Sequence, residues 1–168
     1  DRPYRENEFD IVLSQYGHMF APRPSIVVKE LARVLKPGGI LAFSTWPKEL
    51  FMGKFFKLIE SFSQPLPPEV ASPVLWGDMA IIEDRLKDHF DHIEFARDTM
   101  FAPTMSPAHM LKLFEKNAGP LANLVKALAD DPTKLSNLRN AALVLIEKFF
   151  SNNFLRQDFL MTRCVKRA

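Results

Sequence analysis

A loop rich in polar and aromatic side chains follows the first apolar stretch of the sequence, and it holds the residues best suited to chemistry. The stretch FDIVLSQYGHMF runs from Phe9 to Phe20 and contains one histidine, His18. An imidazole with an ordinary pKa of about 6.5 can take a proton from a substrate at neutral pH, so His18 is the candidate catalytic base. A loop histidine that only packs or forms hydrogen bonds is the alternative.

The rest of the sequence gives no sign of a metal site or of a hydrolytic nucleophile. His89, His92 and His109 are dispersed, and no His-Glu-x-x-His or Cys-x-x-Cys spacing occurs. We therefore expect no metal ion. Ser44 has no partnered histidine at motif spacing, which argues against nucleophilic hydrolysis. A single cysteine, Cys164, excludes an internal disulfide.

Apolar patterns place the polar loop inside a parallel β-α-β crossover. Residues 9–16 contain the continuous run Ile11-Val12-Leu13, typical of a strand covered on both faces. Residues 24–35 predict a helix that Pro37-Gly38-Gly39 ends, and residues 40–46 predict a second strand parallel to the first. Loops at the carboxyl ends of parallel strands bind ligands in doubly wound α/β proteins.

Beyond the crossover, the pattern predicts helices and two more strands. Residues 50–62 form one helix, and Asp78 is the candidate N-cap of the next. Strands follow at 92–101 and 158–166, the last one antiparallel to a neighbour. Ser106 and Asp131 open helices in the stretch between them. We expect residues 104–150 to be a helical cap inserted in a single domain that spans residues 1–168, with plain structural packing of these helices as the alternative.

Composition is that of an ordinary globular domain. Of the 168 residues, 47% are hydrophobic and 25% are charged, and 22 Lys and Arg face 20 Asp and Glu. The net charge of +2 gives no reason to expect nucleic acid as a partner. No apolar run approaches the roughly 18 residues of a membrane span. With one cysteine, a cytoplasmic location is expected.

The stretch FDIVLSQYGHMFAPRPSIVVKELARVLKPGGILAFSTW, residues 9–46, matches one family in order and spacing. Phe9-Asp10, the loop 14–20 and Leu35-Lys36-Pro37-Gly38-Gly39 all fall in place. It closely resembles the second half of class I S-adenosylmethionine-dependent methyltransferases of the small-molecule type. The resemblance implies an α/β fold, the C-terminal half of a doubly wound Rossmann-like sheet with an inserted helical cap.

The same resemblance implies a function and a set of site residues. It implies methyl transfer from S-adenosylmethionine to a small acceptor, which we expect to be apolar or aromatic. Ser14, Gln15 and Tyr16 would contact the cofactor, and the alternative is that they only end a strand and cap a turn. We expect five apolar side chains to face the substrate, with a plain core role as their alternative: Met19, Phe20, Trp46, Met110 and Phe114.

Several parts of the family's cofactor site are not found in this sequence. Family members have a glycine-rich loop after their first strand and acidic residues that hold the ribose and lie near the adenine. Gly38-Gly39 ends a helix and cannot replace that loop. We therefore expect a truncated domain that is inactive alone, and a non-catalytic binding or interaction module is the alternative. A sheet without its first strands would leave an apolar edge open, so a homodimer is also expected, with cover by the cap helices or by a further N-terminal portion as the alternatives.

Overall fold

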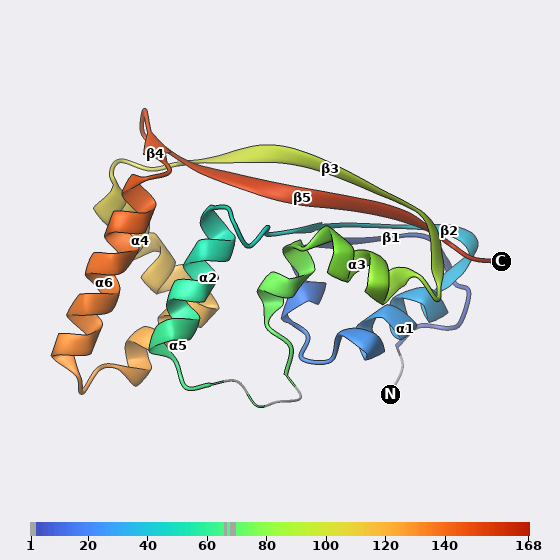
Figure 1. Ribbon diagram of the computed structural model, residues 1–168, viewed down its shortest axis with the longest axis horizontal. Helices are drawn as coiled ribbons and strands as arrows, with labels where there is room; N and C mark the ends of the chain where they lie inside the picture. Colours follow the sequence, from blue (N-terminus) through green and yellow to red (C-terminus); the bar gives the residue numbers. More distant parts are fainter. Residues whose placement is uncertain (1–2, 66, 68–69) are drawn as a thin grey trace. The chain divides into compact units, whose positions relative to one another are not determined.

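The predicted crossover is present and carries the polar loop at its turn. In the computed structural model, which describes residues 3–65, 67 and 70–168, β1 (Phe9–Gln15) leads into a short 3-10 helix η1 (His18–Phe20). The chain continues through α1 (Pro24–Val34) into β2 (Leu35–Thr45), as Figure 1 shows. The two strands run parallel, so the predicted β-α-β unit is confirmed.

Strand β2 begins earlier than predicted, because the Gly-Gly pair lies inside the strand. Leu35 already pairs with Phe9, and the register then shifts before Ile40 pairs with Ile11. Gly38 has a φ of +76°, which favours glycine. A Cβ on Gly39 would lie 2.8 Å from the carbonyl oxygen of Lys36. The two glycines therefore form an irregularity within the strand, where the sequence predicted a turn before it.

The helix starts predicted from capping residues are also confirmed. Asp78, Ser106 and Asp131 each accept a hydrogen bond from a backbone N–H in the first turn of their helix. The elements that follow β2 are α2 (Phe51–Phe62), η2 (Pro73–Gly77), α3 (Met79–Leu86), β3 (Phe90–Pro103), α4 (Pro107–Asn117), α5 (Gly119–Ala127), α6 (Pro132–Glu147), β4 (Phe150–Ser151) and β5 (Phe154–Lys166). The two-residue strand β4 was not predicted.

The strands form one sheet in the order β1-β2-β5-β3, and β4 pairs with β5. Strand β5 is antiparallel to β2, as predicted for the last strand. The chain divides into two compact units. Unit 1 contains residues 1–47, 66–98 and 159–168, and unit 2 contains residues 48–65 and 99–158. Strands β3 and β5 contribute residues to both units.

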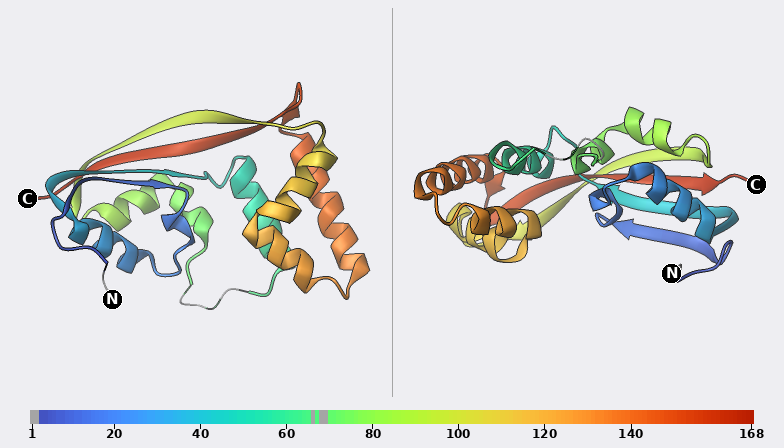
Figure 2. Two further views of the ribbon diagram at one scale, coloured as in Figure 1. Left: turned by 180° about the vertical axis from the view of Figure 1, so that it is seen from behind. Right: turned by 90° about the horizontal axis from the view of Figure 1, so that it is seen from below.

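In unit 1, helices α1 and α3 lie on the same face of the sheet (Figure 2). Leu41, Phe43 and Ile82 are buried in its core. Ile11 and Leu13, however, are 55% and 75% exposed. The prediction that their strand is covered on both faces is therefore wrong for the described residues, because the helices of unit 1 cover only the other face of β1.

Unit 2 is built around an aromatic cluster among its helices. The rings of Phe51 and Phe149 lie 5.5 Å apart between centroids, and those of Phe55 and Phe114 lie 5.0 Å apart. Helix α2 contacts α5 and α6, so it packs in the same unit as the helices of residues 104–150. The cap itself remains a prediction.

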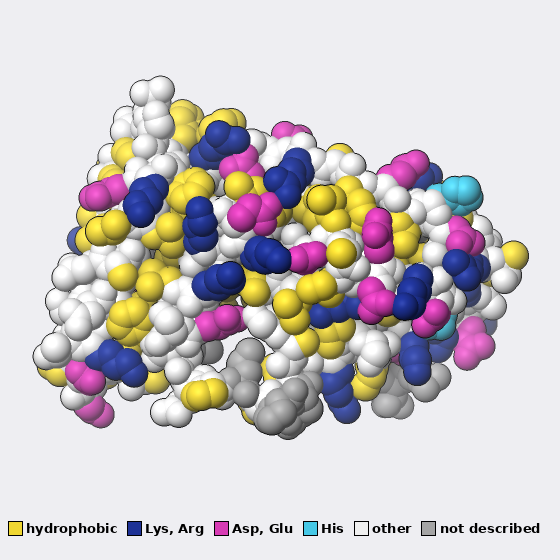
Figure 3. All heavy atoms as spheres, in the orientation of Figure 1, with side chains coloured by type: hydrophobic (Ala, Val, Ile, Leu, Met, Phe, Trp, Pro, Cys, Tyr) yellow, Lys and Arg dark blue, Asp and Glu magenta, His cyan; other side chains and the backbone are white. Residues whose placement is uncertain are grey.

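The surface carries charges of both signs. On the face shown in Figure 3, Lys and Arg side chains are interspersed with Asp and Glu side chains. Among the described residues, no helix combines the length and the apolar character needed to cross a membrane.

Candidate functional site

Four of the predicted site residues gather at the carboxyl ends of β1 and β2 in unit 1. Ser14 and Gln15 end β1, Tyr16 follows them, and Trp46 follows β2. Gln15 is exposed, Ser14 and Tyr16 are half-buried, and Trp46 is buried. This is the end of a parallel strand pair at which a ligand is expected.

Tyr16 and Trp46 form a stacked pair. Their ring centroids are 3.9 Å apart and their planes are 5° from parallel. The backbone N–H of Tyr16 donates to the carbonyl of Ser44 over 3.2 Å, and the ring of Phe159 meets Tyr16 edge-on at 6.3 Å. Burial raises the pKa of Tyr16, and a side-chain hydrogen bond with Ser44 opposes that rise.

The backbone of Tyr16 is held in an uncommon conformation. Its φ is +58°, in the left-handed region that bulky side chains rarely adopt. Such a conformation persists only where the surroundings enforce it, and it is enriched at functional sites. Here the stack on Trp46 and the bond to Ser44 supply that constraint.

Trp46 is fixed from its backbone side by Gly77, the last residue of η2. A Cβ on Gly77 would collide with the carbonyl of Trp46 and would lie 2.6 Å from the Cα of Pro47. Only glycine therefore allows η2 to approach this closely.

The side chain of His18 contacts Ser14 and two aromatic rings. Its Nδ1 lies 2.9 Å from the Ser14 hydroxyl, and its backbone N–H donates to the same oxygen over 3.2 Å. The rings of Phe43 and Trp76 each lie 4.5 Å from the imidazole between centroids, at steep angles. Burial, aided by the charge of Arg85, lowers the pKa of His18 to about 4. The imidazole is therefore neutral at pH 7, and its catalytic role remains a prediction.

Arg85 is a neighbour of this cluster that the sequence patterns did not indicate. Its guanidinium lies 4.5 Å from the ring centroid of Trp76, a cation–π arrangement. Burial lowers the pKa of Arg85. Within the described residues, His18 Nε2, Trp76 Nε1 and Arg85 NH1 are buried without a hydrogen-bond partner. No spacing in the sequence relates α3 to the loop 14–20, so only the folded chain reveals this contact.

The other predicted substrate residues have different surroundings. Met19 is buried and Phe20 is 47% exposed, both in η1. Met110 is buried on α4, and Phe114 packs on Phe51 and Phe55 inside unit 2. Their contact with a substrate remains a prediction.

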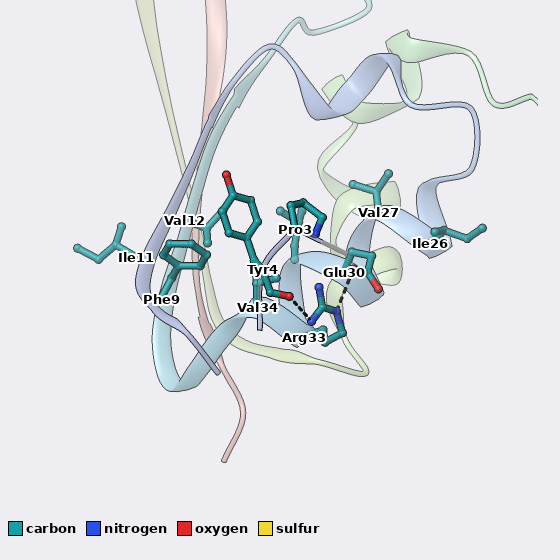
Figure 4. A pocket seen from close by; sticks show the side chains of 11 residues that line it. Pro3, Tyr4, Phe9, Ile11, Val12, Ile26, Val27, Glu30, Arg33 and Val34 are labelled. Carbon is teal, nitrogen blue, oxygen red and sulfur yellow. Dashed lines mark hydrogen bonds and ion pairs between the residues drawn. The ribbon is translucent and has the colours of Figure 1, made fainter. Parts of the chain in front are cut away.

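A distinct apolar pocket of about 590 Å³ lies between β1 and α1 (Figure 4). Tyr4, Phe9 and Val12 contribute to its wall, and an ion pair of Arg33 with Glu30 at 2.9 Å lies beside them. None of the predicted site residues lines this pocket, and it is formed by the first half of β1. It is therefore separate from the candidate site.

The described residues contain no group of three or more His, Cys, Asp or Glu side chains that could hold a metal ion.

Comparison with known proteins points to a single family. Residues 1–43 match the family described as "Methyltransferase domain". An S-adenosylmethionine-dependent methyltransferase of Thermotoga maritima has the same fold, with a TM-score of 0.52, 16% identity, and coverage of 98% of this chain and 59% of that one. The first 43 residues thus match the methyltransferase family, and the whole chain shares the fold of an S-adenosylmethionine-dependent methyltransferase.

Other members of the comparison are longer than this chain. Phosphoethanolamine N-methyltransferase 2 of Haemonchus contortus, in complex with phosphomonomethylethanolamine and S-adenosylhomocysteine, shares the fold at a TM-score of 0.50 and 17% identity, covering 100% of this chain and 36% of that one. An uncharacterized protein of Mycobacterium tuberculosis is 29% identical over 160 residues, which are 95% of this chain and 58% of the relative. The chain thus spans little more than half the length of this relative.

Proposed function

We propose that the protein that carries these residues transfers a methyl group from S-adenosylmethionine to a small apolar or aromatic acceptor. The observation that carries the proposal is the gathering of Ser14, Tyr16 and Trp46 at the carboxyl ends of two parallel strands in a methyltransferase fold. Ligands of open α/β sheets bind at this end of the strands.

The side chains present fit such a cofactor. Ser14 and Gln15 offer a hydroxyl and an amide, which suit the polar groups of a nucleoside and an amino acid. The half-buried ring of Tyr16 is an aromatic group of the kind that attracts a cation, an interaction of roughly 0.5–2 kcal/mol. When bound, S-adenosylmethionine supplies a methyl group attached to positively charged sulfur.

The role of the protein in this reaction is mainly to orient the reactants. Direct displacement needs the attacking atom aligned with the methyl carbon, and holding two reactants in line can contribute several kcal/mol, on the order of 7 or more in the best cases. His18 is unprotonated at pH 7, as a base must be, but the burial that lowers its pKa to about 4 also makes it a weak one. We therefore assign His18 mainly a positioning role.

Three further features of the chain support the proposed acceptor, self-association and location. The exposed ring of Phe20 supports an apolar or aromatic acceptor near the loop. The open, apolar strand β1 supports self-association as a homodimer. Cys164 is unpaired and buried, which supports a reducing, cytoplasmic location.

An assay of S-adenosylhomocysteine formation by the intact protein that carries these residues, with a panel of small acceptors, tests the proposal. We expect acceptor-dependent turnover that Tyr16→Ala reduces at least about tenfold, which corresponds to about 1.4 kcal/mol of transition-state stabilisation. Tyr4→Ala is the control, because Tyr4 is an exposed tyrosine at the separate pocket. Absence of turnover with every acceptor, together with normal folding, would favour a non-catalytic binding module.

A further inference from the structure

Ser14 and His18 form a hydrogen-bonded pair. The bonds that they make limit where the hydroxyl proton and the imidazole proton can lie. The Ser14 oxygen accepts the backbone N–H of His18 and also faces its Nδ1 at 2.9 Å. A serine hydroxyl has one proton to donate and two lone pairs, and a neutral imidazole has one N–H and one lone pair. Two arrangements of these protons are therefore conceivable.

In the first arrangement the proton of the imidazole is on Nδ1. Nδ1–H would then donate to Ser14, whose oxygen would accept two N–H groups. The Ser14 hydroxyl proton would have no acceptor among the described residues, and the Nε2 lone pair would be buried without a donor. Each buried polar group left unpaired costs about 1–3 kcal/mol.

In the second arrangement the proton is on Nε2. The Ser14 hydroxyl then donates to Nδ1, so that both of these groups are satisfied. Nε2–H remains the single unpaired group, and it belongs to a ring that is packed edge-to-face with Phe43 and Trp76. An aromatic ring is a weak acceptor for an N–H group but offers nothing to a nitrogen lone pair. The second arrangement therefore leaves fewer polar groups without a partner among the described residues.

We propose that His18 positions the hydroxyl proton of Ser14 toward Nδ1, so that Ser14 meets a ligand only as a hydrogen-bond acceptor. One lone pair of the Ser14 oxygen is then free, because the other accepts the His18 N–H. The ligand group that Ser14 takes is accordingly an N–H or O–H donor, with an amino or ammonium group giving the strongest bond. The ligand part of this inference rests on the proposed function, whereas the proton arrangement does not.

The surroundings keep the imidazole uncharged, as the proposed arrangement requires. Arg85 lies over Trp76, and its charge adds to burial in disfavouring the imidazolium. A protonated His18 would have to donate from Nδ1 and would reverse the polarity of Ser14. Arg85 on α3 thus helps to keep Ser14, at the end of β1, a hydrogen-bond acceptor.

Long-range proton–nitrogen correlation spectra of the histidine rings test the proton arrangement directly. In the free 168-residue chain at pH 7, we expect His18 to show the pattern of an Nε2–H tautomer. A dominant Nδ1–H pattern would overturn the proposal. This measurement needs no cofactor, so it decides the proton arrangement even if the proposed function is wrong.

The same spectra with saturating S-adenosylhomocysteine test the polarity of the ligand group. If the ligand donates to Ser14, His18 keeps its Nε2–H pattern in the complex. A change to Nδ1–H on binding would show that the ligand takes the Ser14 proton, which overturns the donor assignment. Failure of S-adenosylhomocysteine to bind the intact protein that carries these residues, at any concentration, would instead count against the proposed function.

Matched serine variants supply the second readout. We expect Ser14→Ala to weaken S-adenosylhomocysteine binding about tenfold, the usual effect of losing one hydrogen bond to a ligand. Ser25→Ala, at an exposed position of α1, serves as control and should leave the affinity unchanged. Equal affinities of both variants would remove Ser14 from the ligand site.

Discussion

Tyr16 and Trp46 join the ends of two parallel strands by stacking their rings at 3.9 Å. One ring belongs to a residue with a positive φ, and the other belongs to a residue whose backbone lies close against Gly77. The pair therefore links a strained loop to the rigid end of β2. This relationship makes the loop conformation dependent on an aromatic contact that can be removed by substitution.

Tyr16→Ala should lower the free energy of unfolding by about 2 kcal/mol, because it removes both the aromatic stacking and the burial of the ring. Tyr16→Phe keeps the stack and loses only the side-chain hydrogen bond with Ser44, so a loss of about 1 kcal/mol is expected. Urea titrations followed by circular dichroism measure both values. Equal effects of the two variants would mean that the stack contributes nothing to stability.

The neutral state of His18 makes stability depend on pH. The pKa of this group is about 4 in the folded chain against an ordinary value of about 6.5. The unfolded chain therefore binds more protons between these values. The contribution of His18 is complete above pH 6.5 and is lost as the pH falls toward 4, by about 3 kcal/mol in total.

Unfolding measured between pH 4 and pH 8 checks this dependence. His18→Phe should reduce the loss of stability on acidification relative to the parent chain. His92→Asn is the control, since His92 is exposed and its φ of +51° is one that asparagine tolerates. Identical pH profiles of the parent and the His18 variant would contradict the assignment.

Local signals in the sequence predicted much of this fold, and non-local contacts account for the remainder. Asp78 and Ser106 act on backbone groups within their own helix turn, so the sequence alone identified the helix starts. The burial of His18 depends on Trp76 and Arg85, which are distant in sequence and come close only after folding. For the same reason, the sequence could indicate His18 as a titratable group but not its low pKa.

Exposure of β1 shows a second limit of sequence reasoning. The run Ile11-Val12-Leu13 correctly indicated a strand, because its apolar and β-branched residues favour that structure. Whether such a strand is covered depends on what packs against it. The face of β1 that carries Ile11 and Leu13 is exposed, so the pattern and the exposure differ.

Gly77→Ala should be strongly destabilising, by about 3 kcal/mol, because the added Cβ meets the backbone of Trp46 and Pro47, which cannot move aside cheaply. Gly119→Ala is the matched control. A Cβ at Gly119 meets no atom within 4 Å, and alanine favours the helix that begins there. The midpoint of thermal unfolding should therefore fall in Gly77→Ala. In Gly119→Ala it should rise or stay unchanged. A tolerated Gly77→Ala would refute the close approach of η2.

The 168-residue chain should bind S-adenosylmethionine more weakly than micromolar. A micromolar dissociation constant needs about −8 kcal/mol, and the sequence supplies the loop 14–16 without the glycine-rich loop that the family uses for the methionine part. Calorimetric titration measures this affinity. Micromolar binding by these residues alone would show that the loop after β1 is sufficient for the cofactor.

Leu13→Lys should reduce self-association of the chain. An exposed apolar strand at the end of a sheet offers unpaired backbone groups to another chain, and native edges are usually blocked by charges or proline. β1 has one charged residue, Asp10, and Lys36 neutralises it at 2.8 Å. Leu13 is 75% exposed on the same strand, so a lysine there would place an unpaired charge at the contact.

Sedimentation over a range of concentrations distinguishes this edge from general surface stickiness. The parent chain should show an average mass that rises with concentration, and Leu13→Lys should suppress the rise. Val144→Lys is the control, because Val144 is 52% exposed and lies on the helix α6 rather than on a strand. If both lysine variants act alike, association is a matter of surface charge. If only Leu13→Lys acts, the open edge of β1 is the surface through which copies of this chain meet.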